Sequence, residues 1–233
     1  MRISLILPVY NEYGNLKRNF MRIYSVMKKI GSFEIIIAEN GTSKDGTIDL
    51  AKKFSKLPNV SYFALPKAGK GGALKKGIEL AKGKTIGYID IDLSVPATYI
   101  PAALDAVEAG NAVVYGSRYE KNSKEKVIRS NNRFVASKVF NFLLKNVSGS
   151  KLRDHQCGFK FYDSKFIKPA ARAIPDSHFF FDVATLLRAQ RHHVTLSPLP
   201  VPFKEMRYSK IKRKDIIYYL NCIGKDYIET HFG

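Results

Sequence analysis

Cysteine, long apolar runs and acidic residues are scarce in this chain of 233 residues. Its two cysteines, Cys157 and Cys222, are too few for a disulfide framework, so we expect reduced thiols and a cytoplasmic location. No apolar run approaches the roughly 18 to 20 residues that span a bilayer. The opening stretch Ile3–Val9 is too short for a signal peptide and is soon followed by Glu12. These absences predict a chain that is soluble or lies on a membrane surface.

The shortage of acidic residues leaves a large positive charge. The chain has 39 Lys and Arg against 20 Asp and Glu, a net charge of +19. Residues 1–116 hold 16 basic and 10 acidic residues, whereas residues 117–233 hold 23 and 10, so most of the excess is C-terminal. Such a charge is screened, solvated or matched by an anionic partner. A basic nucleic-acid-binding module is therefore one hypothesis, but no recognised nucleic-acid motif is present and we expect no nucleic-acid partner.

The composition, with 45% apolar and 25% charged residues, predicts a single domain over residues 1–233. Its first half alternates β-rich runs with helical periodicity, which is typical of a mostly parallel α/β sheet. The expected strands are Ile3–Val9, Glu34–Glu39, Val60–Leu65, Thr85–Asp90, Ala112–Gly116 and Gly158–Tyr162. The expected helices are Asn15–Ile30, Asp45–Lys56, Gly72–Lys82, Thr98–Ala109, about Arg129–Val147, and Phe181–Arg191. We divide the domain into a nucleotide-binding half, residues 1–116, and an acceptor-binding half, residues 117–233.

Two carboxylates separated by one residue, Asp90 and Asp92, terminate an apolar strand. Alternation places them on one side of the strand, at the open end of the sheet where α/β proteins bind ligands. Paired carboxylates suit Mg²⁺ or Mn²⁺, which keeps coordination positions for diphosphate oxygens and water. In the alternative interpretation the two residues only cap the turn that contains Pro96.

Further polar clusters follow the other predicted strands. A proline, an aromatic residue and a carboxylate end the first strand and can frame a nucleotide base, while a glutamate after the second strand can accept an imino N–H. A glycine-rich basic loop leads into a helix N-terminus, which is a suitable place for phosphate. Taken singly, each cluster also fits an ordinary turn. The residues expected to contact the nucleotide are Pro8, Tyr10, Glu12, Glu39, Gly69, Lys70 and Gly71.

In their order these motifs resemble glycosyltransferase family 2, with the GT-A fold, from Ile3 to about Lys210. Within the family the chain is most similar to the polyprenyl-phosphate sugar transferases, and above all to the dolichyl-phosphate β-glucosyltransferases. Where many relatives have two aspartates followed by Gly-Ser, this chain has Glu39-Asn40-Gly41-Thr42. The segments that carry the resemblance are residues 8–12, 39–41, 69–73, 90–94, 116–119, 154–160 and 181–183.

The resemblance implies a GT-A (Rossmann-like), mixed, mostly parallel sheet flanked by helices. It also implies an inverting, metal-dependent transfer of a hexose, with glucose favoured, from a nucleotide diphosphate sugar to a polyprenyl or dolichyl phosphate. UDP-glucose is the favoured donor and GDP-mannose the alternative; mannosyl or N-acetylhexosaminyl transfer stays open. A phosphate monoester is already largely ionised near neutral pH, so a strong general base is dispensable. Catalysis then rests on alignment and on stabilisation of the leaving diphosphate.

The donor side of the implied site combines carboxylates with basic residues. Asp90 and Asp92 are expected to hold the metal, and Asp92 also counts among the catalytic residues. Lys70 and the late pair Arg207 and Lys210 are expected to close over the donor phosphates.

The acceptor side of the implied site is mainly arginine. Arg118, Arg129 and Arg133 are expected to hold the acceptor phosphate, because a planar guanidinium engages two phosphate oxygens at once. Asp154 and Asp182 match acidic positions of the family and would contact sugar hydroxyls or orient basic residues. In the alternative interpretation these two aspartates cap helices or pair with arginines.

A lipid acceptor requires contact with a membrane, for which we expect peripheral binding to an anionic cytoplasmic face. Two amphipathic segments fit this role, Phe134–Val147 and Ile211–Phe232. The basic run Lys210–Lys214 would add about 1 kcal/mol per charge near an anionic leaflet, or would bind the donor diphosphate. Packing in the core is the alternative explanation for both apolar stripes.

Other enzyme classes fit the sequence less well. A sugar nucleotidyltransferase would carry a longer glycine-rich loop near the first strand, where Tyr10–Leu16 contains only Gly14. The adjacent His192 and His193 point in different directions and suit the end of a helix better than a metal site. Nothing in the sequence resembles a Ser-His-Asp triad or a zinc site.

Overall fold

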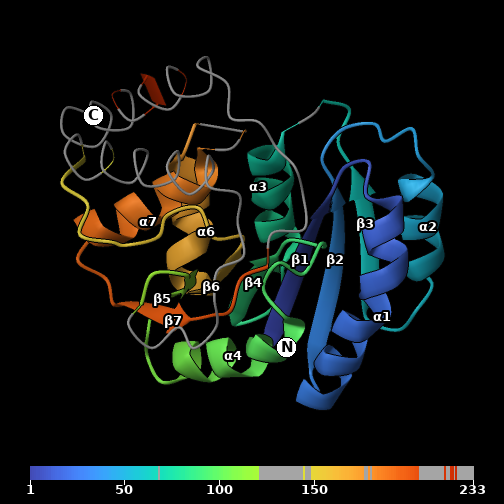
Figure 1. Ribbon diagram of the computed structural model, residues 1–233, viewed down its shortest axis with the longest axis horizontal. Coiled ribbons are helices and arrows are strands. Elements are labelled where there is room, and N and C mark those ends of the chain that lie inside the picture. Colours follow the sequence, from blue (N-terminus) through green and yellow to red (C-terminus); the bar gives the residue numbers. More distant parts are fainter. Residues whose placement is uncertain are drawn as a thin grey trace.

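One continuous sheet of seven strands forms the centre of the computed structural model (Figure 1). The structure describes residues 1–67, 69–120, 144, 148–175, 178, 180–204, 218, 221–222 and 224. The strands are β1 (Ile3–Val9), β2 (Phe33–Glu39), β3 (Val60–Ala64), β4 (Thr85–Ile89), β5 (Val113–Ser117), β6 (Phe159–Asp163) and β7 (Leu196–Pro200). Their order is β3-β2-β1-β4-β6-β5-β7, and β6 runs antiparallel to both of its neighbours while the other pairings are parallel. The expected mixed, mostly parallel sheet is confirmed.

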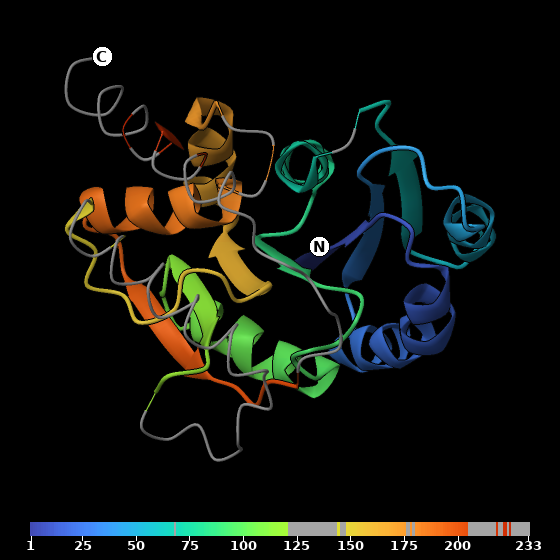
Figure 2. The ribbon, with the colours of Figure 1, turned by 45° about the horizontal axis from the view of Figure 1, so that its top comes forward.

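Helices cover both faces of this sheet. The helices are α1 (Tyr13–Ile30), α2 (Thr47–Phe54), α3 (Lys70–Leu80), the 3-10 turn η1 (Ala97–Tyr99), α4 (Ile100–Glu108), α6 (Ser164–Ala173) and α7 (Phe181–Arg191). Figure 2 shows α3, α6 and α7 on one side of the sheet and α1 and α4 on the other. Alternation along β1 supplies both cores, because Leu5 packs in the cluster of Phe20 while Ile6 packs in the cluster of Leu74.

The expected elements of the first half are present, with ends that differ by a few residues. The sequence pattern did not predict two elements, strand β7 and helix α6. Strand β7 contains Pro198 and Pro200, which argue against a strand, but β7 lies at the edge of the sheet, where missing amide donors are tolerated. Helix α6 contains Pro169 and is capped by Asp163, whose side chain accepts the N–H of Lys165 at 2.7 Å. The expected helix over about residues 129–147 lies outside the described residues, apart from residue 144.

The topology brings several chain segments to one edge of the sheet. Because β1, β2 and β4 are parallel, their carboxyl ends lie together. Strand β6 runs the other way, so its amino end meets the carboxyl end of β4, where Ile89 is paired with Phe159. The N–H of Asp90 extends this ladder by donating to the carbonyl of Gly158 at 3.0 Å. This edge therefore collects residues from both halves of the chain.

Candidate active site

The turn after β4 presents the two carboxylates at this edge. The side chain of Asp90 is 41% exposed. A Cβ atom at residue 158 would lie 1.8 Å from its Oδ2, so only Gly158 leaves room for the carboxylate. Asp92 Oδ1 accepts the N–H of Ser94 at 2.9 Å, and Leu93 between them has a φ of 53°, which is uncommon outside glycine. Asp92 thus does cap its turn, as the alternative interpretation predicted, while Asp90 faces other partners.

A lysine joins the first carboxylate to a second acidic residue. Lys70 is the first residue of α3, and its Nζ lies 2.8 Å from Asp90 Oδ1 and 3.3 Å from Asp182 Oδ2. Asp182 lies in the first turn of α7, and its Oδ1 accepts a hydrogen bond from the hydroxyl of Tyr88 in β4. Elements α3, β4 and α7 thus meet at one group of side chains. Asp182 thus lies beside two lysines rather than an arginine, and its predicted role toward the sugar stays a prediction.

A second lysine lies beneath this group. The side chain of Lys160, in β6, is fully buried, and its Nζ donates to Tyr88 OH and to the carbonyl of His155, both at 3.1 Å. The same Nζ lies 4.0 Å from Asp182 Oδ1. Burial lowers the pKa of Lys160, and Asp182 opposes that shift. We refer to Lys70, Tyr88, Asp90, Lys160 and Asp182 as the charged cluster.

The charges of this cluster set the pKa values of its members. Burial alone would raise the pKa of Asp182, but Lys160 and Lys70 outweigh it and the pKa is lowered. Burial likewise acts to lower the pKa of Lys70, but Asp182 and Asp90 hold it above its ordinary value. The pKa of Asp90 is raised by the partial burial of its carboxyl and by the neighbouring Asp92, and Lys70 counteracts only part of this. The site therefore stabilises positive charge beside Asp90.

The donor atoms at this edge fit a hard divalent cation. Among the described residues no group of three His, Cys, Asp or Glu side chains is placed to hold a metal ion. Mg²⁺ and Mn²⁺ need fewer protein ligands, because one or two carboxylates suffice when water and substrate phosphates complete the coordination. Asp90 and Asp92 supply such oxygens, and the ammonium of Lys70 on Asp90 Oδ1 shows that this oxygen faces a place for positive charge.

A buried ion pair lies at the end of β5. Arg118 Nε and Nη2 lie 2.5 and 2.6 Å from Asp154 Oδ2 and Oδ1, and the two side chains are 3% and 0% exposed. The carboxylate also accepts the N–H of Arg118 at 3.1 Å. The guanidinium carbon lies 4.8 Å from the centre of the Phe203 ring. Asp154 is thus paired with an arginine, which fits both the predicted orienting role and the alternative of a simple ion pair, and the acceptor role of Arg118 stays a prediction.

The residues predicted to contact the base lie at the ends of β1 and β2. Glu39 is fully buried; its Oε1 accepts the N–H of Ser43 at 2.9 Å and also the hydroxyl of Ser43. Glu39 Oε2 is buried and has no hydrogen-bond partner among the described residues. Burial raises the pKa of this carboxyl. Tyr10 is 40% exposed, whereas Pro8 is buried in β1 and Glu12 is nearly buried, so Tyr10 is the member of this group that solvent reaches.

The structure brings some of the predicted site residues into contact, while others lie outside the described residues. Lys70, flanked by Gly69 and Gly71, joins Asp90 and Asp182 in the charged cluster. Sequence reasoning did not assign roles to Tyr88, Lys160 or Gly158, although the last two belong to the segment 154–160 that carried the resemblance. The predicted residues outside the described part of the chain are Arg129, Arg133, Arg207 and Lys210.

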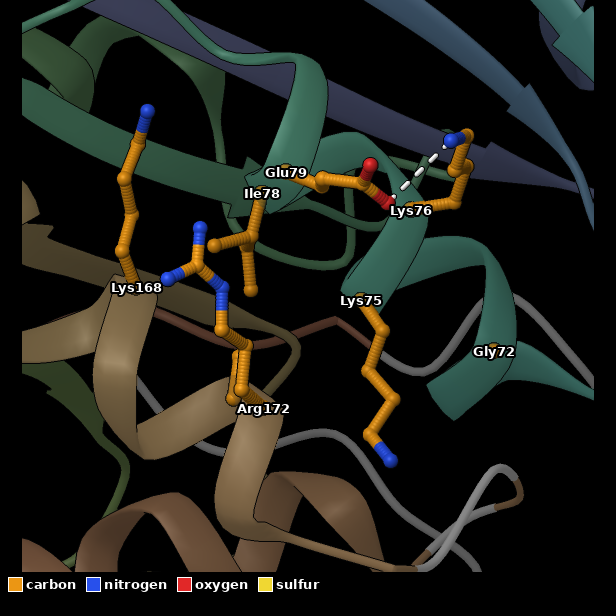
Figure 3. Close-up of a pocket in the computed structure, with 8 residues that line it drawn as sticks. Gly72, Lys75, Lys76, Ile78, Glu79, Lys168 and Arg172 are labelled. Carbon is orange, nitrogen blue, oxygen red and sulfur yellow. Dashed lines mark hydrogen bonds and ion pairs between the residues drawn. The ribbon is translucent and has the colours of Figure 1, made fainter.

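A hollow of about 440 Å³ lies between α3 and α6, away from the charged cluster (Figure 3). Lys76 pairs with Glu79 at 3.1 Å, and Lys168 donates to the carbonyl of Ala81 at 2.8 Å. Figure 3 shows Lys75 pointing away from Arg172, so the positive charges do not converge on one point. The residues that line it are Gly72, Lys75, Lys76, Ile78, Glu79, Lys168, Ala171 and Arg172.

Comparison with known proteins identifies the family. The model of the family described as "Glycosyl transferase family 2" matches residues 4–169. The chain belongs to glycosyltransferase family 2. The chain is 28% identical to the glycosyltransferase AglD of Haloferax volcanii over 99% of its own length, but spans only 37% of AglD. It is also 28% identical to the dolichyl-phosphate beta-glucosyltransferase of Saccharomyces cerevisiae, over 90% of this chain and 69% of the yeast protein.

Solved structures confirm the fold of this family 2 chain. The glucosyl-3-phosphoglycerate synthase of Mycobacterium tuberculosis, solved with Mn²⁺, UDP and phosphoglyceric acid, matches with a TM-score of 0.69 and 15% identity. The match covers 97% of this chain and 77% of that one. The expected GT-A fold is confirmed. In the described part of the glycosyltransferase, no helix combines the length and the apolar character needed to cross a bilayer.

Proposed function

We propose that this glycosyltransferase transfers a hexose from a nucleotide diphosphate sugar to a polyprenyl phosphate, with metal dependence and inversion at the anomeric carbon. The observation that carries the proposal is the position of Asp90 and Asp92 at the carboxyl end of β4, where Asp90 contacts Lys70 at the start of α3. The name of the yeast relative supports dolichyl phosphate as acceptor and glucose as sugar. UDP-glucose is therefore the favoured donor, and GDP-mannose is the alternative.

The donor would lie across the carboxyl ends of β1, β2 and β4. Asp90 and Asp92 would hold Mg²⁺ or Mn²⁺, which supplies a positive charge that stabilises the leaving diphosphate. Lys70 and the amides that begin α3 would face the phosphates. Glu39 Oε2, which is buried and has no hydrogen-bond partner in the described part of the chain, would accept an N–H of the base, and the exposed ring of Tyr10 would lie beside it.

The reaction forms one bond and breaks one bond. An oxygen of the acceptor phosphate attacks the anomeric carbon, while the bond from that carbon to the β-phosphate oxygen breaks. The bonding electrons leave with the nucleoside diphosphate, and the configuration inverts. A phosphate monoester has a second pKa of about 6, so no proton has to be removed at or above neutral pH. The protein then contributes alignment and stabilisation of charge on the leaving group.

The acceptor side belongs to the second half of the chain. Arg129 and Arg133 would bind the lipid phosphate together with Arg118, whose guanidinium is oriented by Asp154. The amphipathic segments over residues 134–147 and 211–232, and the basic run 210–214, would hold the protein on the cytoplasmic face of an anionic membrane. In this arrangement the sugar acceptor reaches the site without leaving the bilayer surface.

Transfer assays with a short polyprenyl phosphate test the proposal. The donors are UDP-glucose, GDP-mannose and UDP-N-acetylglucosamine, each with Mn²⁺ and with EDTA, and NMR of the product reports its anomeric configuration. We expect transfer only with metal, and a loss of at least a hundredfold in Asp92→Asn. Asp105→Asn, on the exposed surface of α4, is the matched control and should keep full activity. Absence of transfer from all three donors, or equal activity of the two variants, contradicts the proposal.

The acceptor assignment has its own test. Arg133→Ala is expected to raise the acceptor KM at least tenfold and to leave the affinity for the donor nucleotide nearly unchanged. The exposed Lys165 provides a control, Lys165→Ala, which removes a positive charge from α6. A loss of donor and acceptor binding by equal factors in Arg133→Ala would assign this arginine elsewhere.

A further inference from the structure

A protein cation already occupies the carboxylate that we assign to the metal. Lys70 Nζ lies 2.8 Å from Asp90 Oδ1, which is a direct charge-assisted hydrogen bond. The other oxygen, Oδ2, packs against the backbone of Gly158, where even a methyl group would lie 1.8 Å away. The oxygen that is better placed for an incoming cation is therefore the one that Lys70 holds.

Lys70 is held in this position from several sides. Its side chain is only 14% exposed, its Nζ also lies 3.3 Å from Asp182 Oδ2, and it lies 5.4 Å from the centre of the Tyr88 ring. Asp182 keeps other partners when Lys70 leaves, because Tyr88 and Lys160 remain beside it. Lys70 can thus move without leaving a buried carboxylate unpaired.

An ammonium and a divalent cation compete for one carboxylate oxygen. Like charges at contact distance repel strongly where solvent is partly excluded, so Lys70 in contact with Asp90 Oδ1 opposes a dication at the same oxygen. Lys70 and Lys160 neutralise two of the three carboxylates Asp90, Asp92 and Asp182, so the site has a net charge of −1. While Lys70 stays in place, this single negative charge is too small to balance the two positive charges of a metal ion. A diphosphate changes this balance, because its oxygens offer Lys70 a new anionic partner.

We propose that Lys70 is a resident counter-ion of Asp90 that a divalent metal must displace and that the donor diphosphate draws away, so that metal and nucleotide bind cooperatively. The inference rests on the proposed function, because it takes Asp90 and Asp92 as the metal site. It predicts weak metal binding in the free enzyme and tighter binding once a nucleoside diphosphate is present. By linkage, the metal tightens nucleotide binding by the same factor.

The test measures Mn²⁺ binding directly, without the transfer reaction. Electron paramagnetic resonance of free Mn²⁺ gives the affinity of the wild type and of Lys70→Met, each alone and with UDP or GDP. We expect Lys70→Met alone to bind Mn²⁺ at least tenfold more tightly than the wild type. The factor by which nucleotide tightens Mn²⁺ binding should be at least tenfold smaller in this variant.

Three further variants, two in α3 and one directly after β4, make the result specific. Lys76→Met removes a charge from the same helix and should leave Mn²⁺ binding within twofold of the wild type. Lys70→Gln loses the charge but keeps a hydrogen-bond donor for Asp90; it should behave like Lys70→Met and serves if that variant does not fold. Asp90→Asn should abolish Mn²⁺ binding with or without Lys70.

The outcomes separate this inference from the proposed function. If neither uncharged variant at position 70 binds Mn²⁺ more tightly than the wild type, or if no form binds Mn²⁺, the counter-ion role is wrong. If these variants bind Mn²⁺ more tightly but neither UDP nor GDP binds to any form, the competition stands and the transfer function fails. If transfer is observed while Lys70 has no effect on Mn²⁺ binding, only the counter-ion role is lost.

Discussion

Two ion pairs of similar geometry but opposite burial allow a quantitative test of the core around Arg118. The pair Arg118 and Asp154 makes two N–H to oxygen contacts of 2.5 and 2.6 Å with side chains 3% and 0% exposed. The pair Arg2 and Glu108 makes two contacts of 2.9 and 2.7 Å with side chains 45% and 41% exposed. The isosteric changes Asp154→Asn and Glu108→Gln remove one charge from each pair.

The structure predicts very different costs for the two changes. Asp154→Asn leaves the guanidinium of Arg118 buried and uncompensated, which costs about 3 to 5 kcal/mol. For a chain of this size that corresponds to a fall in Tm of about 6 to 20 °C. Glu108→Gln changes little, because water already screens the exposed pair. Burial, rather than the number or length of the contacts, sets the difference.

Urea unfolding followed by far-UV circular dichroism and by the fluorescence of the 13 tyrosines measures both free energies, since the chain has no tryptophan. The double change Arg118→Met with Asp154→Leu should recover most of the loss, because no buried charge then remains unpaired. Equal losses in the two single variants would refute the reasoning. So would a double variant that is less stable than Asp154→Asn.

Three further predictions concern the charged site and the membrane. Gly158→Ala should weaken Mn²⁺ binding at least tenfold by displacing Asp90, whereas Gly14→Ala, with open space around the new methyl group, should not. In the folded protein the pKa of Glu39 is raised above its ordinary 4.5. Below about pH 4.5 the side chain is protonated in both the folded and the unfolded state, so it does not change the stability. Above the folded pKa it is ionised in both states, and the buried charge destabilises the folded state. The unfolding free energy of the wild type should therefore fall relative to Glu39→Gln from about pH 4 to pH 7, and a constant difference contradicts this. Binding to anionic vesicles in flotation should weaken with added salt; salt-insensitive binding, or none, would argue against the electrostatic membrane contact.

In the first half of the chain, the local pattern of apolar residues was sufficient to predict most of the fold. The apolar run Ile3–Val9 and the helical spacing over residues 15–30 are decided by neighbours in sequence, and the structure confirms both as β1 and α1. The same reasoning missed α6 and β7, because their prolines argue against regular structure locally. At the edge of the sheet the prolines of β7 are tolerable, and in α6 the burial of Ile167 and Ala171 in the core outweighs the cost of Pro169.

For the site, the sequence by itself determined the residue types: paired carboxylates after β4, a lysine in a glycine-rich loop, and acidic residues late in the chain. Only the tertiary structure decided how they combine. Lys70 and Asp182 are 112 residues apart, and they meet because α3 and α7 pack on the same face of one sheet. Whether Arg118 pairs with Asp154 was equally open in the sequence, since the partner of a buried charge is chosen by the folded interior that excludes water from both.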